Sequence, residues 1–438
     1  MTGIEIGIIS VVAIVVLIYL GMHVAVVLSG VSFIGLWAFK GKFSLAVTLL
    51  TQAATESISS YVFGVVPLFV LMGLLVSIAG IGKDTFTAAH HFLKNILGGL
   101  GIATVIANTA FAAVTGISIA SAAVFTKVAV PEMLKLGYHP RFAVGVVTGS
   151  SVLGMLIPPS LLLIVYALVA EQSVGHMFVA GIVPGLLLAL AFCGLIVIMA
   201  RFFPTRVFSP QKSTETEEHD ITNMRALGLL LPLVLLITTV LGGIYGGFFT
   251  PTEAGAVGVA LSFAIALVRK RLTFRAFWDI LLQSGQITAS ISMLIIGATV
   301  YSRMVSLLGL PNSFSNWVIS AELSYFVLVL VYLLLVIAMG TLIDSISIIL
   351  IVVPIFLPIF SNFTMSDPVW FGIVTVIAAE IGLLTPPMGL SAYVVKASLD
   401  DASISLADVF IGTLPFVVAM VLVTLIIVAF PQTTQLFY

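Results

Sequence analysis

Long hydrophobic segments alternate with short polar interruptions along most of the chain. The first runs from residue 4 to residue 39. It is longer than the about 20 residues that one helix needs to cross a bilayer, and Gly21-Met22-His23 near its middle predicts a turn between two helices. Residues 43–60 are milder and amphipathic, which is typical of a helix lying along the membrane surface. The pattern predicts an all-α polytopic membrane protein.

Two later hydrophobic segments are each divided by small and polar residues. Residues 98–133 hold such an interruption from Thr115 to Ser121, and residues 321–360 hold GTLIDSIS at 340–347. Non-helical backbone at membrane depth is tolerated only where it is buried in protein or lines a cavity. We therefore expect each segment to form a re-entrant helical hairpin with its tip at the polar interruption.

Two further segments carry a proline pair. GMLIPPSLLLIVY begins at Gly154 and GLLTPPMGLSAYV begins at Gly382, so the shared Gly, Leu and Pro-Pro positions keep a constant offset of 228 residues. Two adjacent prolines remove two backbone donors, so each helix must break. We expect broken transmembrane helices at 141–170 and 369–398, with each proline pair beginning a new half-helix.

The order of these elements is repeated along the chain as span, surface helix, span, hairpin, broken helix, span. We expect a loop after residue 80, and the simple spans at 61–80, 176–200, 225–246, 250–268, 285–303 and 405–430. The first repeat is expected to hold scaffold helices and a surface helix at 1–60 and transport elements at 61–200, followed by a polar linker at 201–224. The second repeat is expected to hold scaffold helices and a second surface helix at 225–284, the latter ending at Ser284, and transport elements at 285–430.

Basic residues predict the orientation of the chain. Of the 17 Lys and Arg residues, a cytoplasmic linker leaves only Lys40, Lys42 and Arg303 outside, with Lys127 inside the first hairpin. Basic residues favour the cytoplasmic side. The two hairpins then enter from opposite sides, which makes the halves inverted repeats and puts both termini outside the cytoplasm.

The hairpin tips and the breaks predict binding sites. A helix N-terminus favours an anion and a helix C-terminus leaves carbonyls that suit a small cation. The expected oxygen-lined sites pair Thr115, Ser118 and Ser121 with Gly154–Ser160, and Asp344, Ser345 and Ser347 with Gly382–Thr385. Sodium fits better than a proton, because a proton relay needs several ionisable residues at depth and few occur besides Asp344 and Glu380.

Several of these assignments have structural alternatives. The proline pairs alone would also be explained by kinks between packed helices. Asp344 is suited either to ligating sodium or to capping the following helix, and both roles are compatible. Arg303 is suited either to contacting a carboxylate of the substrate or a partner, or to ordinary snorkelling at the membrane edge. The six histidines have no metal-ligand spacing, so we expect no metal other than sodium and no cofactor.

Other classes of membrane protein fit the sequence less well. The nearest match to a nucleophile elbow, GISIA at 116–120, lacks the last glycine, and no HExxH occurs, so we expect no enzyme. GLWAFKGKF at 35–43 lacks the spacing and the Ser or Thr of a nucleotide-binding loop. A channel remains open, because re-entrant loops also build selectivity filters.

The longest motifs resemble one transporter family. NTAFAAVTGISIASAAVFTKVAVPEMLKLGY, LGMLIPPS and SVGHMFVAGIVPGLLL in the first half, and MGTLIDSISIILIVVPIFLPI with GLLTPP in the second, are similar to the large membrane subunit of tripartite ATP-independent periplasmic (TRAP) transporters. The resemblance covers essentially the whole chain. It implies an ion-transporter fold in which a scaffold holds a mobile transport domain that works as an elevator.

The resemblance also implies site residues. Family sodium sites would fall at hairpin and break positions, namely Ser118, Ser121, Gly154, Pro158, Gly340, Asp344, Gly382, Thr385 and Pro386. The organic acid would lie between the tips, where we expect Gly116, Ser160 and Ser345 beside it and Arg303 as a further contact.

Partners and location follow from the same resemblance. It implies a periplasmic substrate-binding protein and a small four-helix membrane subunit, here expected as a separate polypeptide, in a bacterial inner membrane. No nucleic-acid partner is expected. Family substrates include sialic acid, other sugar acids and C4-dicarboxylates, and we expect sialic acid first. A symporter that works without a binding protein is the alternative within the transporter class.

Overall fold

The computed structural model describes residues 2–209, 221–361, 367–399 and 401–436. The regular structure in these residues is helical, and no strand is present among them apart from one isolated bridge between Tyr138 and Phe208. Residues 210–220 of the linker predicted at 201–224 lie outside the described residues. Among the described residues, six helices are long and apolar enough to cross a membrane, and a bent pair makes a seventh candidate span. The prediction of an all-α polytopic membrane protein is confirmed.

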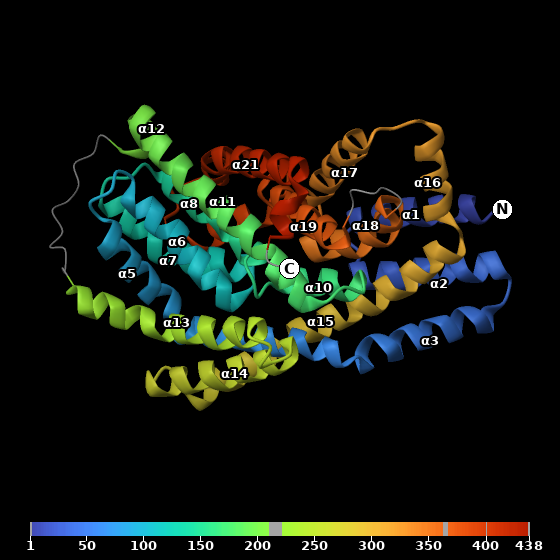
Figure 1. Cartoon of the computed structure of the whole chain (residues 1–438), viewed down its shortest axis with the longest axis horizontal. Coiled ribbons are helices and arrows are strands. Elements are labelled where there is room, and N and C mark those ends of the chain that lie inside the picture. The colour runs from blue at the N-terminus through green and yellow to red at the C-terminus, as the bar shows by residue number, and fades with distance from the viewer. Residues whose placement is uncertain (1, 210–220, 362–366, 400, 437–438) are drawn as a thin grey trace.

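The first half follows the expected order closely (Figure 1). Its elements are α1 Gly3–Tyr19, α2 Val24–Lys40, α3 Phe43–Ser59, η1 Tyr61–Gly64, α4 Val65–Ile78, α5 Ile81–Leu93, α6 Gly99–Thr115, α7 Ser118–Lys135, α8 Pro140–Ser151, α9 Leu153–Leu156, α10 Leu161–Val169, α11 Val174–Phe202 and α12 Pro204–Val207. Helices α6 and α7 form the first hairpin, and α8 to α10 form the first broken helix, which bends by 41°.

The second half repeats this order. Its elements are α13 Asn223–Tyr245, α14 Pro251–Val268, α15 Phe274–Leu307, α16 Leu310–Ser320, α17 Tyr325–Gly340, α18 Ser345–Phe360, α19 Pro368–Leu384, α20 Leu390–Ser398, α21 Leu406–Ala429 and η2 Pro431–Thr434. Helices α17 and α18 form the second hairpin, and α19 and α20 form the second broken helix.

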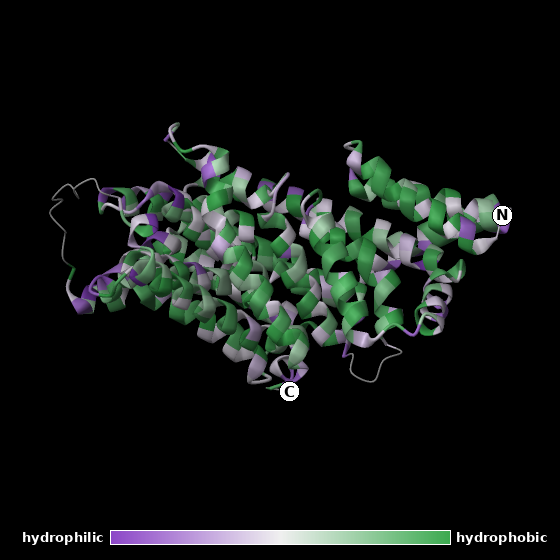
Figure 2. Ribbon diagram, turned by 90° about the horizontal axis from the view of Figure 1, so that it is seen from above, coloured by the Kyte–Doolittle hydropathy of each residue, from purple (hydrophilic) through white to green (hydrophobic). Residues whose placement is uncertain are grey.

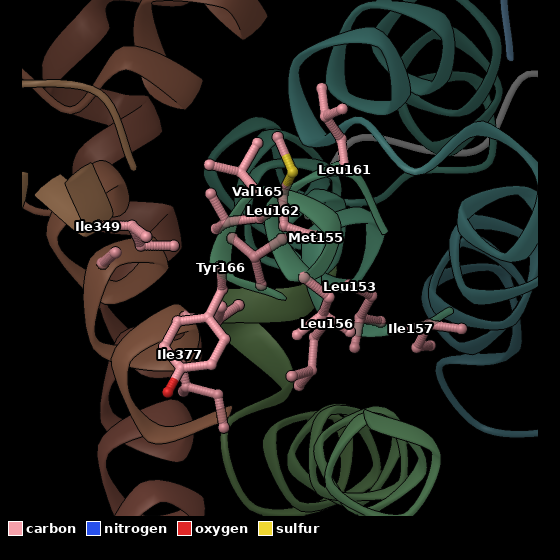
Figure 3. Close-up of a cluster of buried hydrophobic side chains, with 14 of the residues drawn as sticks. Leu153, Met155, Leu156, Ile157, Leu161, Leu162, Val165, Tyr166, Ile349 and Ile377 are labelled. Atoms are coloured by element: carbon pink, nitrogen blue, oxygen red, sulfur yellow. The ribbon is translucent and has the colours of Figure 1, made fainter. Parts of the chain in front are cut away.

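The two halves interlock rather than stand apart. Helix α21 packs along α8, α15 packs along α2, and α10 packs against α18 and α19. Figure 3 shows the apolar side chains of the first broken helix, from Leu153 to Tyr166, beside Ile349 of α18 and Ile377 of α19. Hydrophobic residues dominate the helices, while polar residues gather at loops and helix ends (Figure 2), and many large hydrophobic side chains are exposed. This distribution is consistent with a protein whose helices are surrounded by lipid.

Three helical assignments from the sequence were wrong or missing. Residues 81–93, expected as a loop, form α5, because Ile81, Phe86 and Ala89 make an apolar stripe buried against α6. The surface helix expected to end at Ser284 continues into the next span as one helix, α15. Gly285 alone does not break it, since an isolated glycine in a helix costs only about 1 kcal/mol. Helix α16 was not assigned.

The beginning of helix α16 is marked by a glycine and a proline in the sequence. Gly309 adopts a left-handed conformation with φ +71°, which ends α15, and Pro311 lies in the first turn of α16. Proline is well tolerated there because the first turn has no helical partner for its amide. Helices α5 and α16 follow equivalent spans and precede equivalent hairpins, so the two halves share one more element than the sequence predicted.

Candidate functional site

The first hairpin tip rests on the first broken helix. The turn between α6 and α7 consists of Gly116 and Ile117, and Gly116 has φ +63°, a conformation that favours glycine. A Cβ atom on Gly116 would lie 2.5 Å from the carbonyl oxygen of Pro159. The main-chain N–H of Leu161 donates to the carbonyl of Gly116 at 3.2 Å. The tip is therefore joined to the break by main-chain contact.

The new half-helix in the first break begins after the proline pair, which corrects the sequence interpretation. Helix α10 begins at Leu161, and Ser160 is its N-cap, accepting from the amide of Leu163 at 3.3 Å. The Ser160 hydroxyl also donates to the carbonyl of Met155. The helix begins after Ser160, and not at the proline pair, because the serine side-chain oxygen accepts a hydrogen bond from a free amide at the helix start.

The second break has the same arrangement with different residues. Helix α20 begins at Leu390 after the N-cap Gly389, which has φ +49°, so here too the proline pair lies in the break itself. The main-chain N–H of Met388 donates to the carbonyl of Thr341 in the second hairpin tip at 3.2 Å. Each hairpin tip thus accepts one main-chain hydrogen bond from the segment just past a proline pair.

Glycines bring the backbones of hairpin and broken helix into contact in both halves. A Cβ on Gly154 would lie 3.2 Å from the amide nitrogen of Ser118. A Cβ on Gly382, 228 residues later, would lie 2.5 Å from the Cα of Gly340. Such approaches leave main-chain polar groups close together, which is the usual construction of an ion site at a broken helix.

Hydroxyls predicted as ligands have different partners in the structure. Thr115 donates to the carbonyl of Phe111 at 3.0 Å and Thr385 donates to that of Ile381 at 2.7 Å, one helical turn earlier in each case. The Ser118 hydroxyl is buried and has no hydrogen-bond partner. A hydroxyl that donates keeps its lone pairs, so the oxygens of all three residues are still able to accept a cation.

A buried asparagine connects the first hairpin to the first broken helix. Asn108 of α6 accepts from the Ser121 hydroxyl of α7 and donates to the Ser150 hydroxyl of α8 at 2.6 Å. All three side chains are fully buried. The sequence analysis did not single out Asn108, although an amide inside the apolar segment 98–133 was the available signal.

Asp344 caps the helix that follows the second tip. Its carboxylate accepts from the amide of Ser347 at 3.0 Å and from the Ser347 hydroxyl at 2.5 Å. The capping interpretation of Asp344 is confirmed, and its role as a sodium ligand stays a prediction. Gly340, also expected at this site, is the last residue of α17 and contacts Gly382.

Ser345, expected beside the substrate, instead donates to a carboxylate of the second broken helix. Its hydroxyl lies 2.8 Å from Oε1 of Glu380 on α19. Glu380 is 1% exposed, and its other oxygen, Oε2, has no hydrogen-bond partner. The sequence marked Glu380 only as one of few ionisable residues at depth; the structure puts it at the second hairpin.

Arg303 lies on α15 and forms an ion pair with Glu56 of α3. The Ser57 and Thr299 hydroxyls join the same two helices at 3.1 Å. The ion pair of Arg303 is thus with the first surface helix.

The two breaks differ in accessibility. Residues 154–160 of the first break are all buried, whereas Pro386, Pro387 and Met388 of the second are exposed.

A cavity of about 500 Å³ lies between α7 and the segment after α20, with Lys127 and Asp401 in its lining. The hydrogen bond from the Ser403 side chain holds the pKa of Asp401 below its ordinary value. Among the residues that the structure describes, no group of three or more His, Cys, Asp or Glu is placed to hold a metal ion.

Paired hairpins that abut paired broken helices, within a bundle of apolar spans, place the chain among the polytopic membrane proteins. The family model described as "Tripartite ATP-independent periplasmic transporter, DctM component" matches residues 11–433. The chain belongs to this family.

Relatives agree with this assignment, and a solved structure shares the fold. The chain is 36% identical to the C4-dicarboxylate TRAP transporter large permease protein DctM of Pseudomonas aeruginosa, over 81% of this chain and 80% of that protein. It is 32% identical to the sialic acid TRAP transporter large permease protein SiaM of Vibrio cholerae, over 90% of each. The fold is similar to that of Neisseria gonorrhoeae MtrF, with a TM-score of 0.60, 14% identity, and coverage of 87% of this chain and 83% of that one.

Proposed function

We propose that this chain is the large permease subunit of a sodium-coupled TRAP transporter that imports an organic acid anion. The observation that carries the proposal is the main-chain hydrogen bond from just past each proline pair to a hairpin tip, found once in each half. Such contacts set unwound backbone from two elements against each other inside the protein. In transporters of this construction, substrate and coupling ions bind where such interruptions meet.

Sodium is the proposed coupling ion. Unwound backbone in each half supplies oxygen atoms, and oxygen is the ligand that hard cations prefer. The close approach of Gly340 and Gly382, and of Gly154 and Ser118, keeps side chains from filling the space beside these atoms. The proposed ligand set keeps the positions expected from the family, with Ser118 strengthened by its unpartnered hydroxyl.

The proposed substrate is an organic acid anion bound between the hairpin tips. Helix α7 begins beside the first tip with no side-chain cap, since its N-cap residue is Ile117. An uncapped N-terminus presents free amides that favour a carboxylate. The two relatives described above, a C4-dicarboxylate permease and a sialic acid permease, put both substrate classes first in any screen.

Transport is proposed to follow an elevator mechanism. The hairpins and broken helices would move together as one body against a scaffold that includes α15, α3 and α2. The Arg303–Glu56 ion pair joins α15 to α3, which fits a scaffold role for Arg303 better than substrate contact. The exposed second break and the cavity beside α7 would form a path from the site toward the cytoplasm.

We propose that the protein works in a bacterial inner membrane with a periplasmic substrate-binding protein and a small membrane subunit, and that both termini are periplasmic. One relative, the isethionate TRAP transporter permease protein DctMQ of Oleidesulfovibrio alaskensis, is longer, and the match covers 60% of it. This size difference is consistent with a small subunit that is separate in some systems and fused in others.

Uptake by reconstituted protein tests the proposal. The chain, a small subunit and the binding protein would be assembled in proteoliposomes and screened with labelled sialic acid and C4-dicarboxylates. Uptake of one acid should require an inward sodium gradient and the binding protein. Uptake with sodium but without the binding protein would instead indicate an independent symporter. Ion conductance that persists without either would indicate a channel.

A further inference from the structure

A second cavity, of about 350 Å³, lies between α8, α11, α12 and α21. Its lining includes His139 and Arg141 at the start of α8, Thr205 and Arg206 of α12, and Ile411 of α21. The volume falls within the about 300–1,000 Å³ that is typical of small-molecule sites. None of these residues belongs to the proposed sodium or substrate positions, so the cavity is a separate candidate site.

This cavity lies at the ends of two candidate membrane spans. Helix α11 ends at Phe202 and α21 begins at Leu406. The ends of membrane-spanning helices lie near the lipid headgroups. Four exposed apolar residues follow one another at helical spacing along one face of α21, namely Ile411, Leu414, Val418 and Leu422. Because Ile411 also lines the cavity, one wall of the cavity continues into a surface that faces lipid acyl chains.

The positive charge in the lining is only partly balanced. The Nε atom of Arg141 donates to Oδ1 of Asp408 at 2.6 Å. The other oxygen of Asp408 accepts from the amide of Ser405 at 2.9 Å and from its hydroxyl at 2.6 Å. Arg206 forms no ion pair with the described residues, and its guanidinium lies 5.4 Å from the centre of the Phe203 ring. The positive charge of Arg206 is therefore left for an anion.

The lining also holds hydrogen-bond donors that suit a phosphate diester. The Arg206 guanidinium presents N–H groups in a planar fork that matches two phosphate oxygens, and the Thr205 hydroxyl is a further donor. Nδ1 of His139 accepts from the amide of Arg141 at 3.2 Å, so the neutral ring carries its proton on Nε2. A Cβ on Gly412 would lie 1.9 Å from the carbonyl oxygen of Arg141. The backbones of α8 and α21 thus touch beside the cavity, which fixes the distance between these two walls.

We propose that this cavity binds the headgroup of an anionic phospholipid, with Arg206 on the phosphate and an acyl chain along the exposed face of α21. The phosphate supplies the missing negative charge, and the acyl chain explains why the cavity opens onto an apolar surface. Basic pockets between membrane helices on the cytoplasmic side bind such headgroups, and α12 leads into the linker that is proposed to be cytoplasmic. A bound lipid would connect the start of the first broken helix to the last span.

Lipid binding to the purified full chain tests this site without requiring transport. The delipidated chain would be titrated in detergent with dioleoyl phosphatidylglycerol or dioleoyl phosphatidylcholine, and bound lipid would be counted by native mass spectrometry. We expect wild type to bind phosphatidylglycerol in preference to phosphatidylcholine. Arg206→Gln should bind phosphatidylglycerol about fivefold more weakly, as expected for the loss of one basic contact. Arg201→Gln is the matched control, because Arg201 is exposed on α11 and lies outside the lining, and it should bind as wild type does.

Thr205→Val keeps the inference testable if Arg206→Gln does not fold, and it should also weaken phosphatidylglycerol binding. Wild-type affinity in both variants, or an equal loss in Arg201→Gln, would overturn the site. Glycerol phosphate, added as a soluble competitor, should displace little of the lipid. Complete displacement at equal concentration would show that a soluble anion is the occupant and would overturn the lipid assignment. Sodium and uptake play no part in these measurements, so their failure would leave the proposed function intact.

Discussion

Replacing Gly382 by alanine tests the backbone contact on which the proposed site depends. The added methyl carbon would lie 2.5 Å from the Cα of Gly340 and 2.7 Å from the carbonyl oxygen of Ile337. Both atoms belong to the backbone of α17, so no side-chain rotation relieves the clash. The two helices must separate by about 0.9 Å to reach an ordinary contact of 3.4 Å. Overpacking of this kind costs about 1–3 kcal/mol.

The Gly382→Ala substitution also contributes a smaller gain in helix stability. Alanine is favoured over glycine in a helix by about 1 kcal/mol, so we expect the free energy of unfolding to fall by about 2 kcal/mol at the upper end of the overpacking cost. Sodium-driven uptake should fall more than stability does, because separating α17 from α19 moves the tip away from the break.

The measurement is thermal unfolding of the purified protein in detergent, combined with uptake in proteoliposomes. Gly194→Ala is the control, since Gly194 lies within α11 and a Cβ there meets no atom within 4 Å. That variant should be as stable as wild type or slightly more stable. A Gly382→Ala protein that unfolds at the wild-type temperature and transports normally would refute the reasoning.

Three further predictions concern single side chains. Asp344→Asn should keep the helix cap, because Asn caps about as well as Asp, but should weaken sodium activation of uptake; unchanged sodium dependence would remove Asp344 as a ligand. Asn108→Ala should lower the free energy of unfolding by about 1–3 kcal/mol, because it leaves two buried hydroxyls without their amide partner. Chemical denaturation of this variant and of a matched Asn108→Asp variant would measure the loss of stability. Arg303→Gln should cost about 1 kcal/mol or less through its partly exposed pair with Glu56 and should leave the Michaelis constant for the substrate unchanged; a large rise in that constant would restore Arg303 as a substrate contact.

The hydrophobic pattern was sufficient to predict most of the fold. The hairpin at 98–133 appears as α6 and α7, and the proline pairs coincide with the breaks. These elements were predictable because the length of an apolar segment and the positions of its glycines and prolines determine locally where a helix begins and ends. Helix α5 was missed because its apolar stripe is short and mixed with charged residues, so its helical form depends on packing against α6.

The chemistry of the site was less predictable than its position. The sequence placed Ser345 near a tip, but the direction of its hydroxyl depends on Glu380, 35 residues further along the chain. The same holds for Asn108, whose partners lie 13 and 42 residues away. Side-chain partners across helices are set by tertiary packing, and no local pattern encodes them.

The differences between the halves bear on how two similar sets of elements produce directed transport. Here the first break is buried and the second is exposed, and the valine at 152 replaces the carboxylate found at 380. A cation released from the proposed sites would leave by the exposed second break. If that is the order of events, blocking the second break with a bulky label at a Met388→Cys position should slow sodium release while leaving the number of bound ions unchanged.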